Sequence, residues 1–189
     1  MKLIFGLTGF NCSGKNLVAD YLAKHCGFNR FSVREMIGEE LALRDLVPTR
    51  ENLIALGNNL REQEGVEVWV KKAIDKARKN GYSQVAIESL RNPGEVHYLR
   101  NLPNFYLIGV VASPRVRFTR MKLRGALGDP KTWKEFCTRE AQDKGEGEKD
   151  TGQQIASCMK LTDFRVLNNG PKENTYKLID SIIQKFDLS

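Results

Sequence analysis

The sequence lacks any apolar run near the roughly 18 residues of a membrane span, and after Met1 it leads at once into a short strand-like segment. We therefore expect neither a membrane partner nor a signal peptide. Histidine is scarce, at two residues, and the four cysteines include no C-x-x-C pair, so the pattern does not predict a zinc site. These features indicate reduced thiols and a cytoplasmic protein.

The composition describes one domain with an anionic partner. The chain has 189 residues, and 41% of them are apolar, which suits a single domain over 1–189 with its own core. The 30 Lys and Arg residues outnumber the 23 Asp and Glu residues, for a net charge of +7. This excess points to nucleic acid, nucleotides or phosphorylated metabolites. No helix-turn-helix, RNA-binding or zinc pattern occurs, so a nucleic-acid partner is not expected.

Apolar periodicity predicts short strands that alternate with helices. The five predicted strands cover about residues 2–8, 28–33, 84–89, 104–112 and 163–167. This alternation predicts an α/β fold with a five-stranded, mostly parallel sheet. Residues 125–152 are polar and punctuated by glycine, which is typical of an insert. Its charged end, 143–152, is predicted to be a solvated loop.

The strongest chemical signal is a G-x-x-x-x-G-K run from Gly9 to Lys15, between a buried strand and a helix. Glycines let backbone N–H groups turn toward phosphates, and the helix N-terminus adds partial positive charge. Lys15 would then reach the β- and γ-phosphates of ATP. The alternative is a glycine-rich turn with an incidental lysine. The residues expected to bind the nucleotide here are Gly9, Asn11, Cys12, Ser13, Gly14, Lys15 and Asn16.

One position departs from this pattern. Asn16 follows the lysine, where a Ser or Thr hydroxyl normally ligates Mg²⁺. An amide oxygen can coordinate the ion or hold one of its waters. Mg²⁺ is therefore still expected with ATP, although the departure weakens the metal assignment more than the phosphate assignment. The Cys12 thiol is interpreted as a small tolerated side chain rather than a redox control.

The layout resembles the nucleoside monophosphate kinase family over nearly the whole chain, and no N-K-x-D segment typical of GTPases occurs. The segments FSVRE (31–35), IESLRNPGEV (87–96) and TDFRVLNNG (162–170) are similar to a less-characterised branch. Its members are labelled AAA-family ATPases, deoxynucleotide kinase-like or dephospho-CoA-kinase-like proteins. The resemblance implies a three-layer P-loop kinase fold, with acceptor-binding helices at about 34–80 and a lid at about 125–152.

The resemblance also implies roles for four residues beyond the loop. Glu88, at the end of the third strand, would hold the waters of magnesium or orient the attacking oxygen. Arg91 would grip the acceptor phosphate with its planar guanidinium. Arg120 and Arg124, one helical turn apart at the base of the lid, would neutralise the transferred phosphoryl group. The alternatives are a Glu88–Lys15 pair and a solvated basic helix.

Three further residues are candidates with simpler alternatives. Arg34 begins the first acceptor-binding helix and is expected to contact the acceptor. For the Arg61 side chain, a position in the acceptor pocket and a position in solvent are equally expected, whereas Arg50 is expected to face solvent. Asn168 lies after the fifth strand, where relatives contact adenine largely through backbone, although a simple turn explains it equally well.

We therefore expect an ATP-dependent phosphotransferase. Its acceptor would be a nucleoside or deoxynucleoside monophosphate or a similar small phosphorylated compound, and a dephospho-CoA kinase-like activity is an alternative. A second alternative is a nucleotide-responsive slow ATPase or regulatory module that acts with a protein or RNA partner. Asn16 and the basic charge favour that alternative. Stimulation of ATP turnover by a monophosphate, rather than by a macromolecule, distinguishes the two.

Overall fold

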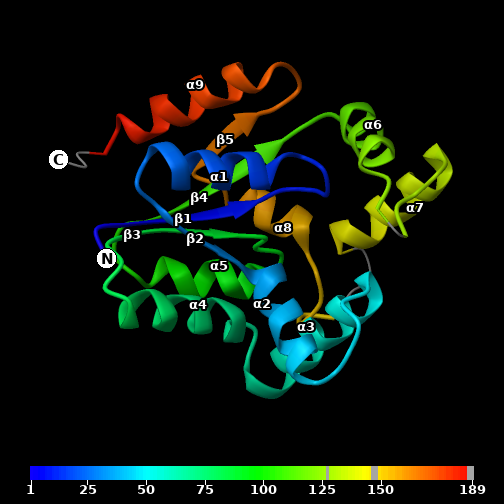
Figure 1. Cartoon of the computed structure of the whole chain (residues 1–189), viewed down its shortest axis with the longest axis horizontal. Helices are drawn as coiled ribbons and strands as arrows, with labels where there is room; N and C mark the ends of the chain where they lie inside the picture. Colours follow the sequence, from blue (N-terminus) through cyan, green and yellow to red (C-terminus); the bar gives the residue numbers. More distant parts are fainter. Residues whose placement is uncertain (127, 146–148, 187–189) are drawn as a thin grey trace.

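A computed structural model describes residues 1–126, 128–145 and 149–186. Five strands form one parallel sheet in the order β2-β3-β1-β4-β5 (Figure 1). The strands are β1 (Leu3–Thr8), β2 (Asn29–Ser32), β3 (Gln84–Glu88), β4 (Phe105–Val111) and β5 (Phe164–Leu167). Each lies within the range that the periodicity predicts. The predicted α/β class with a five-stranded parallel sheet is confirmed.

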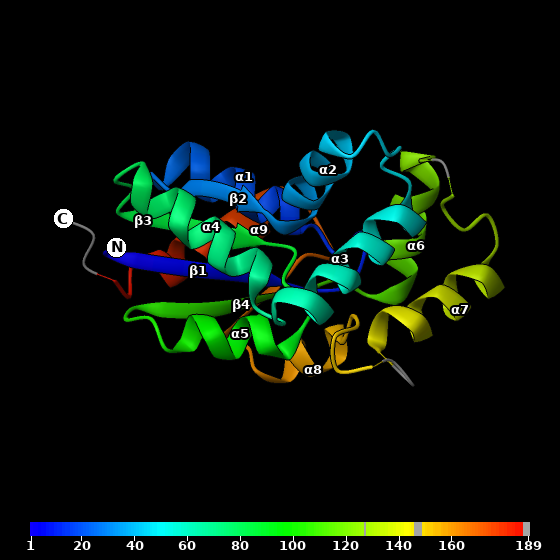
Figure 2. The same ribbon diagram turned by 90° about the horizontal axis from the view of Figure 1, so that it is seen from below.

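Helices cover both faces of this sheet. They are α1 (Lys15–His25), α2 (Val33–Leu43), α3 (Arg50–Glu64), α4 (Val68–Lys79), α5 (Pro93–Arg100), α6 (Pro114–Arg124), α7 (Trp133–Lys144), α8 (Ile155–Lys160) and α9 (Lys172–Ile183). Figure 1 shows α1 and α9 on one face and α4, α5 and α8 on the other. Figures 1 and 2 place α2, α3, α6 and α7 together beyond the ends to which the strands point.

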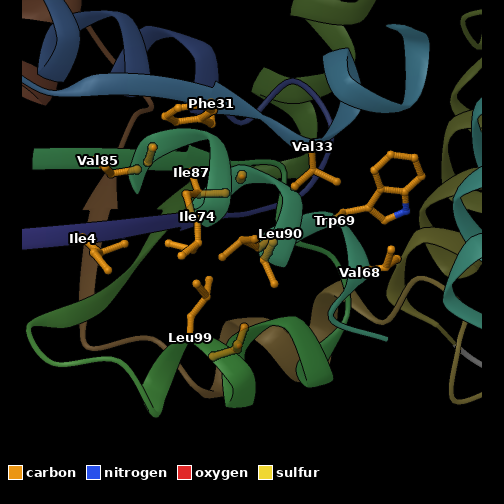
Figure 3. Packing of buried hydrophobic residues seen from close by; sticks show 14 of the residues in the cluster. Ile4, Phe31, Val33, Val68, Trp69, Ile74, Val85, Ile87, Leu90 and Leu99 are labelled. Carbon is orange, nitrogen blue, oxygen red and sulfur yellow. The ribbon is translucent and has the colours of Figure 1, made fainter. Parts of the chain in front are cut away.

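The core explains why the strands read as continuous apolar runs. All six residues of β1 are buried, because helices cover the sheet on both sides. On the α4–α5 side, Ile4, Ile74, Ile87 and Leu99 belong to one cluster (Figure 3). Burying each such side chain contributes about 1.5–3 kcal/mol. Within the described ranges, no helix has the length and apolar character needed to cross a membrane.

The insert is more ordered than its composition predicts. Over 125–152 it contains α7, which begins with a capping box between Thr132 and Glu135. Residues 127 and 146–148 of the expected lid lie outside the described residues. The prediction of a solvated loop from residue 143 is wrong at its start, because Asp143 lies within α7 and is buried. Its carboxylate pairs with an arginine of α3, a partner that local composition does not reveal.

Candidate functional site

The loop between β1 and α1 has a backbone that requires glycine. Gly9 and Gly14 have φ angles of 147° and 100°, in the left-handed region that other residues rarely adopt. A Cβ on Gly14 would lie 2.0 Å from Nδ2 of Asn168, and one on Gly9 would lie 2.4 Å from the carbonyl oxygen of Val110. Gly14 is the N-cap of α1 and has no side chain to cap the helix. The start of α1 therefore stays accessible to an anion.

The Lys15 side chain packs against the glycine loop. Its Nζ donates to the carbonyl oxygens of Gly9 at 2.7 Å and Phe10 at 3.1 Å. Burial, together with the positive charge of Arg91, lowers the pKa of Lys15 to about 7. A phosphate at this position would favour the charged ammonium.

A cavity of about 370 Å³, which we call the lysine cavity, opens over this loop. The cavity brings the glycine loop and α6 together, because Arg120 and Arg124 of α6 line it along with residues of the loop. The lining residues are Asn11, Cys12, Gly14, Lys15, Asn16, Arg34, Ser89, Arg91, Arg120 and Arg124. Of the site residues predicted from sequence, Gly9, Ser13, Arg61, Glu88 and Asn168 do not line it.

A second cavity adjoins the first. It has a volume of about 40 Å³, and we call it the four-arginine cavity. Its lining residues are Val33, Arg34, Ile37, Arg50, Leu53, Ile54, Arg61, Ser89, Arg91 and Gln153. Arg34, Ser89 and Arg91 line both cavities. These three residues thus form a common wall between Lys15 and the helices predicted to bind an acceptor.

Arg91 is fixed from two sides. Its Nη1 donates to Oε1 of Gln153 at 2.9 Å, and its backbone N–H donates to Glu95 at 2.9 Å. Burial lowers the pKa of this guanidinium, and Asp143 is the neighbouring charge that most strongly opposes the effect. Arg91 thus presents a positive charge in a confined position, which suits recognition of a phosphate.

Arg61 lies within α3, and most of its donors are engaged. Its Nε and Nη2 donate to Oε1 of Glu95 at 3.2 and 2.7 Å, and its Nη1 donates to Asn58 at 3.3 Å. The guanidinium still lines the four-arginine cavity. Its role as an acceptor ligand stays a prediction, whereas its contact with Glu95 supports the turn that carries Arg91.

Glu88 pairs with a residue that the sequence analysis missed. The sequence suggests Lys15 as an alternative partner of Glu88. In the structure, Oε1 of Glu88 instead accepts hydrogen bonds from Nε and Nη2 of Arg30 on β2, the first at 3.0 Å. The carboxylate is 1% exposed, and its Oε2 has no hydrogen-bond partner among the described residues. A buried acidic oxygen without a donor is suited to a cation or its waters.

Arg120 and Asn168 brace the glycine loop. Nη1 of Arg120 lies 3.5 and 3.4 Å from the carbonyl oxygens of Cys12 and Ser13, and its Nη2 donates to Oδ1 of Asn168 at 3.2 Å. Nδ2 of Asn168 donates to the same Ser13 carbonyl at 2.9 Å. The buried Asn168 side chain is thus occupied by the loop, and the predicted adenine contact through its backbone stays a prediction.

Arg124 and Arg50 each pair with an aspartate. Nε and Nη2 of Arg124 donate to the two carboxylate oxygens of Asp129 at 3.0 and 2.7 Å. The expectation that Arg50 faces solvent is wrong, because its side chain is 19% exposed and its Nη2 lies 2.6 Å from Oδ1 of Asp143. No local pattern separates this arginine from a solvated one, since its partner is 93 residues away.

Ser89 is a further residue that sequence reasoning missed. It follows β3 with a φ of 67°, a left-handed conformation that costs a non-glycine residue about 1–2 kcal/mol. Backbone strain of this kind is concentrated at functional sites. Here it turns the chain between Glu88 and Arg91, at the wall shared by the two cavities. A serine at a strand end carries no sequence signal for this geometry.

A family comparison identifies the shared architecture. The family model described as "AAA domain" matches residues 6–144, which include the glycine loop and all of α7. A UPF0200 protein from Thermococcus kodakarensis is 31% identical over 192 residues, covering 97% of this chain and all of that protein. The relative is therefore similar over its full length.

Solved structures show the same fold at low sequence identity. TT1252 from Thermus thermophilus superposes with a TM-score of 0.59 at 17% identity, covering 98% of both chains. Shikimate kinase from Acinetobacter baumannii, in complex with shikimate, superposes with a TM-score of 0.56 at 12% identity, covering 97% of this chain and 92% of that one. At such identities these similarities establish the fold alone.

Proposed function

This chain belongs to the AAA domain family, and on that premise we propose that it is an ATP-dependent phosphotransferase. The proposed acceptor is a small phosphorylated compound such as a nucleoside or deoxynucleoside monophosphate. The observation that carries the proposal is the wall shared by the lysine cavity and the four-arginine cavity. ATP in the first cavity and an acceptor in the second would meet at Arg34, Ser89 and Arg91.

The lining of the four-arginine cavity supports a phosphorylated acceptor over a neutral alcohol. Four guanidiniums line it, and none of its described lining residues is a carboxylate. An alcohol must lose a proton to a base when it attacks phosphorus, whereas a phosphate dianion attacks through an oxygen that carries no proton. In the proposed step, that oxygen bonds to the γ-phosphorus, and the bond from the γ-phosphorus to the β–γ bridging oxygen breaks to release ADP.

Residues of this chain would stabilise the charge that moves in this step. Lys15 and Arg120 line the nucleotide side, and Arg91 lies where the two ligands meet. Arg124 is the fourth candidate, at the end of α6. Phosphoryl transfer depends mainly on positioning and on charge neutralisation, so these four cations are the catalytic residues of the proposal.

Glu88 and Asn16 fit a bound Mg²⁺. The buried Oε2 of Glu88 has no donor within the described part of the chain, and Asn16 lines the lysine cavity at the position after the P-loop lysine. Both supply oxygen ligands, which Mg²⁺ prefers, directly or through water. The ion would neutralise charge between the β- and γ-phosphates.

An acceptor screen tests the proposal. ADP release is measured with ATP, Mg²⁺ and each of the nucleoside and deoxynucleoside monophosphates, dephospho-CoA and shikimate. A phosphorylated acceptor is expected to raise ADP release at least tenfold, and Arg91→Met to abolish the rise while ATP binding persists. The proposal is wrong if shikimate alone stimulates turnover or if every acceptor leaves the rate unchanged. In the latter case, stimulation by an added RNA or protein supports the slow ATPase alternative that Asn16 favours.

A further inference from the structure

Asp143 is a buried acid among basic groups. Its side chain is 6% exposed at the C-terminal end of α7, and Oδ1 accepts a hydrogen bond from Nη2 of Arg50 at 2.6 Å. Arg50 lines the four-arginine cavity. Asp143 also counteracts the lowering of the pKa values of Lys15 and Arg91. One carboxylate of the insert therefore offsets part of the positive charge around the two cavities.

The charge of the four-arginine cavity suits a phosphate, because four guanidiniums line it. One of them, Arg50, is already paired with the Asp143 carboxylate. An acceptor phosphate that binds Arg50 must therefore compete with this carboxylate.

The ion pair connects α3, which contributes Arg50 to the four-arginine cavity, with α7. Arg50 begins α3, and Asp143 lies near the end of α7. Gln153, which follows α7 in the chain, also reaches the cavity and accepts a hydrogen bond from Arg91. If another anion replaced the Asp143 carboxylate on Arg50, this end of α7 would lose its ion pair with α3. Arg50 would still have a negatively charged partner, the new anion.

We propose that Asp143 occupies an anion site of the acceptor, and that the acceptor phosphate replaces it on Arg50. Arg50 is then an acceptor-binding residue, and the Asp143 carboxylate competes with the acceptor phosphate for it. This assignment rests on the proposed function only for the identity of the acceptor. No covalent change is involved, because one anion displaces another from the same guanidinium.

Asp143→Asn tests the competition directly, with inorganic phosphate as the probe. The protein is first saturated with a non-hydrolysable ATP analogue so that phosphate reports only on the second site, and Kd is measured by calorimetry. Asp143→Asn is expected to bind phosphate about tenfold more tightly than the unaltered chain, and Arg50→Gln about tenfold more weakly. Glu140→Gln is the matched control, since it removes another α7 carboxylate, which pairs at 2.7 Å with Arg117, an arginine that does not line the cavity.

A second measurement uses the unaltered chain. Added phosphate should increase hydrogen exchange at the C-terminal half of α7, because Asp143 loses its partner. Unchanged or weaker phosphate binding in Asp143→Asn overturns the proposal, as does phosphate-induced protection of α7.

The acceptor screen separates this inference from the proposed function. If no acceptor stimulates turnover but Asp143→Asn binds phosphate tenfold more tightly, the anion site stands and the kinase proposal fails. If an acceptor is found and Asp143→Asn changes neither its KM nor the Kd of phosphate, the kinase proposal stands and the competition fails.

Discussion

Arg61 and Glu95 form an ion pair that is closed to water, with side chains 3% and 0% exposed and 2.7 Å between Nη2 and Oε1. The other carboxylate oxygen of Glu95 accepts the backbone N–H groups of Arg91 and Asn92 at 2.9 and 3.1 Å. A single buried carboxylate thus joins α3 to the turn that presents Arg91.

Glu95→Gln should lower the free energy of unfolding by about 3–5 kcal/mol, because it leaves the Arg61 charge buried without a counter-ion. Urea denaturation measures the change. Glu40→Gln, which removes an exposed i,i+4 partner of Arg44, should cost less than about 1 kcal/mol. Similar losses of unfolding free energy in the two variants would show that the buried pair stabilises the protein no more than the exposed pair does.

Nucleotide binding should take up a proton above pH 7. The pKa of Lys15 is about 7 in the free protein, and bound phosphates should raise it toward its ordinary value of 10.5. Between these values the complex holds more protons than the free protein, so affinity should fall as pH rises. At pH 6 Lys15 is mostly protonated in both states, and its contribution to uptake becomes small.

Calorimetry at pH 8.5 in two buffers with different ionisation enthalpies measures this uptake. Lys15→Met is the control, because it retains any proton exchange of the nucleotide itself. Identical uptake by both proteins would contradict the assignment of the proton to Lys15.

Ser89→Gly should stabilise the protein by about 1 kcal/mol, or about 2–4 °C in Tm, since glycine adopts a positive φ without strain. Ser89→Ala is the matched control: it removes the hydroxyl, keeps the Cβ and should give no gain. We also expect Ser89→Gly to reduce turnover, because the wall between the two cavities becomes less rigid. A Tm gain in Ser89→Ala equal to that in Ser89→Gly would rule out backbone strain as the cause.

Asn168→Ala should cost about 2–4 kcal/mol and weaken binding of an ATP analogue. The substitution leaves the carbonyl oxygen of Ser13, Oγ1 of Thr175 and Nη2 of Arg120 without this partner. Asn169→Ala is the neighbouring control, since its side chain accepts an N–H from Ser113 in an exposed position. Thermal denaturation with and without the analogue compares the two. Equal effects would contradict the bracing role of Asn168.

The sequence predicted most of the fold because its signals are local. The apolar run of β1, the glycines after it and the helical spacing of α1 are all read within 25 residues. The local glycine motif also predicted Lys15, whereas Arg34, Arg91, Arg120 and Arg124 were candidates through the resemblance to nucleoside monophosphate kinases. All five line the lysine cavity.

The missed features depend on contacts between distant segments. Arg30 and Glu88 are 58 residues apart in the sequence, and Arg50 and Asp143 are 93 apart. Neither pair has a spacing that periodicity can detect, so Arg50 and Asp143 were each assigned to solvent. The burial of a charged residue in an amphipathic segment can be predicted only when the element that packs against it is known.

The central position of β1 has a consequence for how the chain folds during synthesis. β1 precedes the other four strands of the sheet in the chain, yet its two neighbours are β3 and β4, and Leu3 lies beside Gln84. Neither edge of β1 can pair until at least 80 further residues have left the ribosome, and loop closure over such a length slows formation of the sheet. The glycine loop is thus translated before the strands that fix β1, and it becomes rigid only after they have paired.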